Sequence, residues 1–227
     1  MLRQFMRSCG VGKIYKRLVE PIVNRLFMEQ LIRHTGNFAK TTWLGYPIWQ
    51  NTLDLWTIQE TLAEVKPALL IECGTNRGGS ARFYSHLFDL MGHGEIVSID
   101  VEKLHELQLP RVQFLLGSSV AEENLAIVRE RVRRCGGPVM VILDSDHSEG
   151  HVAKELEAYS EFVTPGSYLM VQDGVIDVVG SFHGAGRPGP LPAIKKFLPS
   201  HPEFVLDTER CERFLVTHHP MGWLRRK

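Results

Sequence analysis

The sequence has no excess charge of either sign, and it has few cysteines. Of its 227 residues, 26 are Lys or Arg and 26 are Asp or Glu. No overall field therefore draws the protein onto nucleic acid or another polyanion, and we expect no nucleic-acid partner. The four cysteines (9, 73, 135 and 211) are far apart and lack CxxC or any other metal-ligand spacing. This predicts reduced, largely structural thiols.

Long hydrophobic runs are also absent. No stretch approaches the roughly 20 apolar residues that span a bilayer, and the first residues lack the apolar core of a signal peptide. We therefore expect no transmembrane segment and a cytoplasmic location. A composition of 44% hydrophobic and 23% charged residues is typical of an ordinary globular protein with one main domain.

The first 35 residues are the one region with a marked excess of positive charge, because they contain seven Lys or Arg and only two acidic residues. Apolar side chains recur there every four residues, at Ile14, Leu18, Ile22 and Leu26. This spacing predicts a helix with one apolar stripe and a basic opposite face. We favour a helix packed on the main domain, with peripheral membrane contact or partner binding as the alternative. A homo-oligomer is also expected.

From residue 55 onward, short apolar runs alternate with helical stretches. The expected strands are 68–73, 95–100, 112–116, 139–144 and 168–173, and the expected helices are 55–65, 81–91, 121–134 and 148–162. A hairpin-like pair at 204–207 and 214–217 follows an irregular loop at 184–192. This alternation predicts an α/β fold with a doubly wound, mostly parallel, seven-stranded Rossmann-like sheet and an antiparallel edge strand. We place an N-terminal helical segment and linker at 1–54 and the main domain at 55–227.

Ligands of such sheets bind beyond the carboxyl ends of the strands, so polar residues there are candidate site residues. The first strand ends in Glu72-Cys-Gly-Thr-Asn-Arg-Gly-Gly-Ser80, where Gly74, Gly78 and Gly79 allow the backbone to approach a ligand closely. Asn76 occupies the second glycine position of a dinucleotide fingerprint, which argues against NAD and FAD. Glu72 suits a ligand with an ammonium group, such as S-adenosylmethionine, and we include Thr75 and Ser80 in this loop site.

Two further strand ends would complete the cofactor site. Asp100 follows Gly74 by 26 residues, and its carboxylate can accept hydrogen bonds from both ribose hydroxyls. Ser118 and Ser119 could line the adenine, although a plain turn is an equal alternative at that position.

The last two strand ends are acidic. Asp144 and Asp173 carry the oxygen ligands that Mg²⁺ or a similar hard ion prefers, and such an ion would orient and acidify an acceptor hydroxyl for in-line attack on the methyl sulfonium. His147 is then the natural general base. Asp146 or Asp173 could instead cap the following helix or turn.

Other histidines and aromatic residues give weaker signals. His147 and His151 are four residues apart, but Ser148 stands where a zincin has Glu, which disfavours zinc. The tryptophans at 43, 49 and 56 are interpreted as packing residues, and Trp43 and Tyr46 have only a weak claim to substrate contact.

Several motifs together resemble the cephalosporin hydroxylase-like family, which includes rhamnosyl and other sugar O-methyltransferases. They are WLGYP (43–47), DLWxxQE (54–60), KPxLLIECGTxxGGS (66–80), LDSDHxxxHV (143–152), GSYLMVQD (166–173) and GPxxAI (189–194). The resemblance extends from residue 43 to about 225 and leaves only the basic N-terminal segment outside it.

The resemblance implies an S-adenosylmethionine-dependent methyltransferase with a metal at the ends of strands four and five, bound by Asp144 and Asp173. Related metal-dependent enzymes have an acidic pair at the end of strand five, whereas this chain has Gln172-Asp173. Gln172 can offer a neutral carbonyl oxygen as a third ligand. We expect the acceptor to be a small molecule or glycan, methylated on a sugar hydroxyl. The alternatives are a non-haem iron hydroxylase using His147, Asp144 and His151, and a catalytically silent binding protein.

Overall fold

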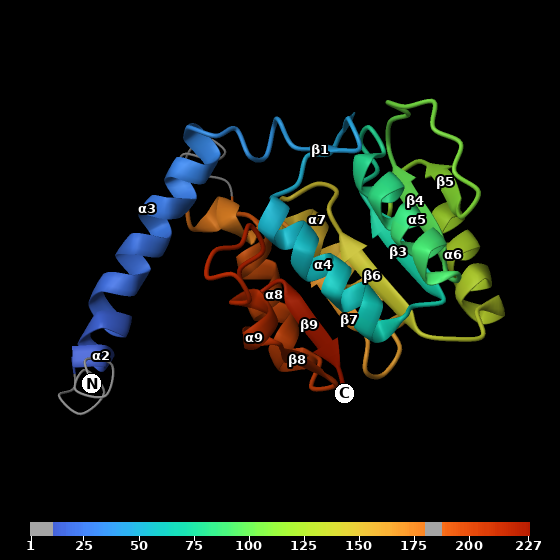
Figure 1. Ribbon diagram of the computed structural model, residues 1–227. Helices are drawn as coiled ribbons and strands as arrows, with labels where there is room; N and C mark the ends of the chain where they lie inside the picture. Colours follow the sequence, from blue (N-terminus) through green and yellow to red (C-terminus); the bar gives the residue numbers. More distant parts are fainter. Residues whose placement is uncertain (1–10, 180–187) are drawn as a thin grey trace.

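Seven strands form one sheet in the computed structural model, which describes residues 11–179 and 188–227. Their order is β5-β4-β3-β6-β7-β9-β8. The strands are β3 (Leu69–Cys73), β4 (Glu95–Asp100), β5 (Val112–Leu116), β6 (Val139–Leu143), β7 (Tyr168–Val171), β8 (Phe204–Leu206) and β9 (Trp223–Arg226). The first five are parallel, whereas β9 pairs antiparallel with both β7 and β8. The predicted mostly parallel, seven-stranded sheet with an antiparallel edge is confirmed (Figure 1).

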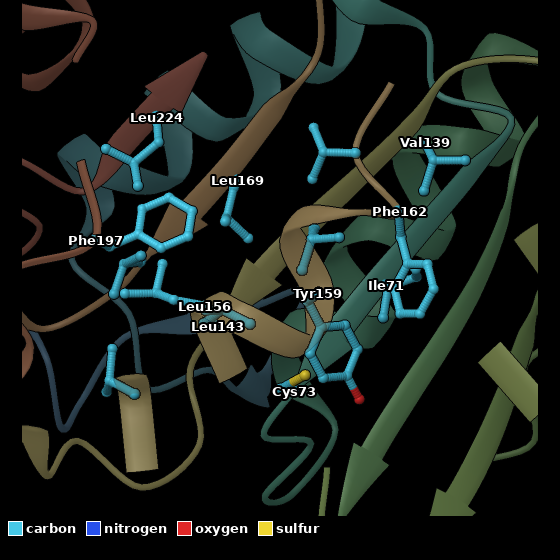
Figure 2. Packing of buried hydrophobic residues seen from close by; sticks show 14 of the residues in the cluster. Ile71, Cys73, Val139, Leu143, Leu156, Tyr159, Phe162, Leu169, Phe197 and Leu224 are labelled. Atoms are coloured by element: carbon cyan, nitrogen blue, oxygen red, sulfur yellow. The ribbon is translucent and has the colours of Figure 1, made fainter. Parts of the chain in front are cut away.

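Helices cover both faces of this sheet, as expected for a doubly wound fold. They are α4 (Thr52–Val65), α5 (Gly79–Met91), α6 (Glu122–Arg134), α7 (Glu149–Ser160), α8 (Pro190–Ser200), the short α9 (Thr208–Cys211) and the 3₁₀ helix η2 (Gly174–Asp177). One hydrophobic cluster joins one sheet face to α6, α7 and α8, and Figure 2 shows Tyr159 of that cluster near Cys73 and Ile71, and Phe197 near Leu224. A second cluster joins the other face to α4 and α5. The carboxyl ends of the parallel strands are thereby fixed in one rigid edge.

Local sequence sets the ends of α4, which starts three residues earlier than predicted. The Asn51 side chain accepts a hydrogen bond from the Leu53 N–H at 3.1 Å, which caps the first turn. Lys66 ends the helix with a left-handed φ of 49° immediately before Pro67.

The predicted strand at 214–217 is wrong, because the partner of β8 is β9. Leu215 has a left-handed φ of 69°, which breaks an extended run. The next residues bind Asp54 of α4 instead of a strand: the Thr217 hydroxyl and the His218 N–H donate to its two carboxylate oxygens at 2.5 and 2.8 Å.

The predicted irregular loop at 184–192 ends sooner than expected. Residues 184–187 lie outside the described residues, and α8 already starts at Pro190. The Asp177 carboxylate accepts the N–H groups of Gly189 and Leu191 at 2.7 and 2.8 Å, which organises the first turn of that helix.

The N-terminal helix departs most from expectation. It comprises α2 (Val11–Ile14), a π-helical turn at Tyr15–Val19 (η1) and α3 (Glu20–Arg33). We predicted that its apolar stripe packs on the main domain, but Ile14, Leu18, Ile22 and Leu26 are 56–60% exposed. Figure 1 shows this helix, in blue, extending beyond the sheet and its helices. Met28 is buried, and the Asn24 amide donates to the Leu215 carbonyl at 3.4 Å, so the carboxyl-terminal part of the helix contacts the main domain. None of the helices formed by the described residues has the length and apolar character to cross a membrane.

Candidate active site

The strand order changes direction between β3 and β6, and ligands of open α/β sheets bind at such a switch point. A cavity of about 700 Å³ opens there, which lies within the range of small-molecule sites. Most predicted site residues line it: Gly74, Thr75, Gly79, Ser80, Asp100, Ser118, Ser119, Asp144, His147 and Asp173. Glu72, Gly78 and Gln172 do not line it.

Two glycines of the loop between β3 and α5 are required by close backbone contacts. Gly74 has φ +102°, and a Cβ there would lie 1.9 Å from the Asp144 carbonyl oxygen. A Cβ at Gly79 would lie 2.3 Å from the carbonyl oxygen of Pro47. The loop is therefore held between the end of β6 and the linker before α4. Gly78 is the N-cap of α5 and supports this turn without facing the cavity.

Glu72 lies beneath the cavity floor and not at its surface. Its side chain is fully buried and accepts a hydrogen bond from the Ser98 hydroxyl at 2.5 Å, while Ser98 also bonds Thr75 Oγ1 at 2.6 Å. Burial raises the pKa of Glu72 to about 7, because the ionised form loses its hydration. Thr75 lines the cavity, so Glu72 is connected to the ligand space through two hydroxyl groups.

Asp100, Ser118 and Ser119 lie at the end of the cavity nearest β4 and β5. Asp100 accepts the N–H groups of Asn76 and Glu102 at 2.7 and 3.1 Å, which orients its carboxylate beside the glycine loop. The Ser119 hydroxyl donates to buried Glu155 at 2.5 Å. Hydrogen bonding to Glu155 raises the pKa of the neighbouring His151.

Three titratable groups meet at the other end of the cavity. Each of Asp144, His147 and Asp173 offers a ligand atom, and these atoms lie within 4.8 Å of one another. His147 Nε2 is 3.4 Å from Asp173 Oδ2. Burial, followed by the negative charge of Asp173, raises the pKa of Asp144 well above its ordinary value. A group of this kind is typical of sites that bind a cation.

The amide of Gln172 is engaged with its neighbours. Gln50 Nε2 donates to Asp144 Oδ2 at 2.9 Å and lies 2.7 Å from Gln172 Oε1. Gln50 belongs to the linker before α4, and sequence reasoning missed it because nothing in its local pattern marks it as a site residue.

The capping alternative applies to one aspartate and not to the other. Asp146 Oδ1 accepts the Ser148 N–H at 2.7 Å, next to the start of α7. Asp173 has φ 57° at the N-cap of η2 but makes no side-chain capping bond, which leaves its carboxylate directed to the cavity.

The sequence analysis also missed His219, which accepts a hydrogen bond from the backbone of Asp173. The Asp173 N–H donates to Nδ1 of buried His219 at 2.9 Å. His219 Nε2 in turn faces Asp54 Oδ2 at 3.7 Å. The sequence did offer one sign of this contact, since Asp54 is an acidic residue on the buried face of α4. The residues that Asp54 contacts are more than 160 residues away in sequence, so the local pattern does not reveal them.

The donor set does not favour the iron alternative. Within the described ranges 11–179 and 188–227, the cluster that converges contains one histidine and two carboxylates, whereas the iron sites considered above use two histidines and one carboxylate. His151 is instead paired with Glu155 at 3.3 Å.

The aromatic residues are distributed differently from expectation. Trp43 donates from its indole to His86 at 3.0 Å, and the Tyr46 hydroxyl donates to the Arg77 carbonyl at 2.7 Å; neither lines the cavity. Trp49, which we interpreted as packing, lines it together with Phe38.

Comparison with known proteins agrees with this architecture. The family model for rhamnosyl O-methyltransferase/CmcI matches residues 36–227. The rhamnosyl O-methyltransferase of Mycobacterium tuberculosis is 33% identical over 196 residues, which cover 83% of this chain and 79% of the relative. That of Mycobacterium leprae is 31% identical over 231 residues and covers 98% and 97%.

Solved structures share the fold at lower identity. A CmcI structure with Mg and SAM is 17% identical, with a TM-score of 0.66 over 84% of this chain and 78% of CmcI. The mycinamycin-pathway methyltransferase MycE, in complex with Mg, SAH and mycinamycin VI, is 19% identical, with a TM-score of 0.54 over 85% and 52%.

The fold and the cavity at its switch point define an S-adenosylmethionine-dependent O-methyltransferase. The chain belongs to the rhamnosyl O-methyltransferase/CmcI family, since the family model matches most of its length. The resemblance inferred from the motifs is confirmed.

Proposed function

We propose that the protein transfers a methyl group from S-adenosylmethionine to a hydroxyl of a sugar, either in a glycolipid or in a glycosylated natural product. One observation carries the proposal: the glycine loop and the cluster of Asp144, His147 and Asp173 open into the same cavity. A cofactor bound at the loop would therefore present its methyl group next to these acids. The names of the 31–33% identical relatives support a sugar as the acceptor.

The cofactor would occupy the end of the cavity formed by β3, β4 and β5. We assign the aminoacyl part to the loop at Gly74, Thr75, Gly79 and Ser80, with Glu72 and Gly78 as supporting residues. Asp100 would accept the ribose hydroxyls. Ser118 and Ser119 would line the adenine.

The residues at the other end fit a hard divalent ion such as Mg²⁺. Asp144 and Asp173 would hold it with oxygen ligands, and Gln172, whose amide lies beside Gln50 and Asp144, would be the third ligand. The raised pKa of Asp144 beside Asp173 supports this fit, because a cation would relieve the repulsion between two ionised carboxylates. When bound, the ion supplies Lewis acidity to the acceptor hydroxyl.

His147 is our candidate for the base. It would take the hydroxyl proton as the acceptor oxygen forms its bond to the methyl carbon and the sulfur–methyl bond breaks. The imidazolium that results is stabilised by Asp173, whose Oδ2 lies 3.4 Å from Nε2. S-adenosylhomocysteine and the methylated sugar leave.

Two measurements on the purified chain test this proposal. Calorimetric titration with S-adenosylhomocysteine should show binding. Methyl transfer from S-adenosylmethionine to a panel of methyl glycosides should require Mg²⁺ and stop in EDTA. Cofactor binding with methylation of catechol but of no glycoside would contradict the acceptor class, and full activity in EDTA would contradict the metal.

We also propose that the enzyme works in the cytoplasm.

We further propose that a second copy of the chain covers the exposed apolar stripe of the N-terminal helix. Eight apolar side chains there are 42–60% exposed: Ile14, Tyr15, Leu18, Val19, Ile22, Val23, Leu26 and Phe27. Most of the stability of a helix in a protein comes from packing of its apolar face, and exposed apolar patches of this kind mark contact surfaces. The division of the chain at residue 54 stays a prediction.

Light scattering should show an oligomer that the double substitution Leu18→Glu, Ile22→Glu dissociates. A monomeric wild type that sediments with phosphatidylglycerol vesicles would instead favour membrane contact.

A further inference from the structure

We infer that Trp49 and Phe38 form the wall against which the acceptor sugar packs, by the apolar C–H face of its ring. The inference rests on the proposed function and names the residues that select the acceptor. Both side chains line the same cavity as Asp144, His147 and Asp173. Their rings are 6.2 Å apart between centroids and inclined by 52°.

Trp49 is held in an exposed position by two buried neighbours. Ile48 and Gln50 are 1% and 3% exposed, whereas Trp49 is 47% exposed. Leaving so much of an indole in water forgoes the stabilisation that its burial would give. Because the backbone on either side is buried, the ring cannot turn inward without displacing the chain, whereas a ligand in the cavity would cover it.

Gln50, the residue after Trp49, contacts one of the proposed metal ligands. Its Nε2 donates to Asp144 Oδ2 at 2.9 Å, so the residue next to Trp49 in sequence contacts the proposed metal ligand. Trp49 and Asp144 also line the same cavity, so a molecule packed on Trp49 can extend its polar edge toward Asp144. Phe38 is fixed in turn by buried His218, whose ring centroid lies 5.7 Å from its own.

The charges at this end of the cavity indicate a neutral acceptor. Asp144, Asp146 and Asp173 are acidic, and the lone arginine among the described lining residues, Arg77, belongs to the glycine loop. Once Asp144 and Asp173 hold a divalent cation their charges are balanced, and no arginine or lysine among the described lining residues at this end is placed to pair with a phosphate or carboxylate of the acceptor. An apolar wall facing a set of oxygen-binding groups is the arrangement that fits a sugar, which has an apolar C–H face and a rim of hydroxyls.

The experiment compares Trp49→Ala and Trp49→Phe with Trp56→Ala. Trp56 is also exposed but bonds Glu60 and does not line the cavity, so it is a matched control. The probe is methyl α-L-rhamnopyranoside, with S-adenosylhomocysteine titrated in parallel. We expect Trp49→Ala to raise KM for the glycoside by roughly tenfold or more, with a smaller change in kcat. Trp49→Phe should recover most of the affinity, and Trp56→Ala should behave as wild type.

A binding readout separates this inference from the proposed function. Saturation-transfer NMR of the glycoside with the S-adenosylhomocysteine complex should show contact to one face of the sugar ring, and Trp49→Ala should abolish it. An unchanged KM and an unchanged NMR contact in Trp49→Ala would overturn the inference while leaving the proposed function intact. Weaker S-adenosylhomocysteine binding in that variant would also overturn it, by placing Trp49 at the cofactor. If the wild type binds S-adenosylhomocysteine but methylates only catechol, the proposed acceptor class itself fails.

Discussion

The two ends of the cavity are built from different kinds of structure. The end that we assign to the cofactor consists mainly of strand termini and the first turn of a helix, and at Gly74 the backbone packs so closely that a Cβ would lie 1.9 Å from the Asp144 carbonyl oxygen. At the acceptor end, Phe38, Trp49 and Gln50 come from the linker before α4, and Asp173 is held by His219 from the end of the chain. The fold itself therefore fixes the site that we propose for the cofactor, while segments outside the parallel strands shape the site that we propose for the acceptor. We accordingly expect substitutions at the acceptor end to alter acceptor preference without disturbing cofactor binding.

The largest expected effect is a loss of stability caused by a substitution in the glycine loop, at the proposed cofactor end of the cavity. In Gly74→Ala the new methyl group would lie 1.9 Å from the Asp144 carbonyl oxygen, at a backbone φ of +102° that side chains rarely adopt. We expect a loss of more than about 4 kcal/mol in the free energy of unfolding, or no folded protein. Urea unfolding followed by circular dichroism measures it.

Gly92→Ala is the control, because its φ is +74° but no atom lies within 4 Å of the added Cβ. It should lose only about 1 kcal/mol. Equal losses in the two variants would mean that backbone strain, and not the contact between β3 and β6, makes Gly74 necessary.

The sequence predicted much of the cofactor end because glycines and strand-end acids are local signals. Gly74, Thr75, Gly79, Ser80 and Asp100 all line the cavity as their strand positions suggested. The acceptor end was less visible, since Gln50 meets Asp144 across 94 residues and His219 meets Asp173 across 46. Contacts between residues so far apart produce no periodic pattern in the sequence, so sequence analysis does not detect them. The misplaced strand at 214–217 has the same cause, because Asp54 competes for those backbone and side-chain donors.

A second prediction tests whether the two ends are separable. Asp144→Ala should lower turnover by roughly 10²–10⁴-fold, because it removes a proposed metal ligand. It should leave the Kd of S-adenosylhomocysteine within about threefold, because the cofactor residues come from other strands. Stopped assays and calorimetry measure the two quantities on the same preparation.

Asp146→Ala is the matched control. Asp146 also lines the cavity, but its carboxylate accepts the Ser148 N–H in an Asx turn before α7, so we expect a loss of about 1 kcal/mol in stability and little change in turnover. Loss of cofactor binding in Asp144→Ala would show that the two ends act as one unit.

The smallest expected effect concerns Glu72, which the sequence analysis assigned to the cofactor site and which the structure places beneath the floor of the cavity. Its pKa is raised from 4.5 to about 7 by burial. Below pH 4.5 both folded and unfolded chains carry the proton. Between pH 4.5 and 7 the unfolded chain ionises first, so stability falls as the pH rises, and above pH 7 the cost is complete at about 3 kcal/mol.

Glu72→Gln removes that titration and can still accept the Ser98 hydrogen bond. Its stability relative to wild type should therefore increase from pH 4.5 to 7 and then stay constant, as measured by urea unfolding at a series of pH values without ligand. Glu123→Gln on the exposed side of α6 should show no such trend. A Glu72→Gln difference that does not vary with pH would mean that Glu72 is ionised in the folded protein, and an ionised Glu72 could attract the ammonium group of the cofactor through the Thr75 and Ser98 hydroxyls.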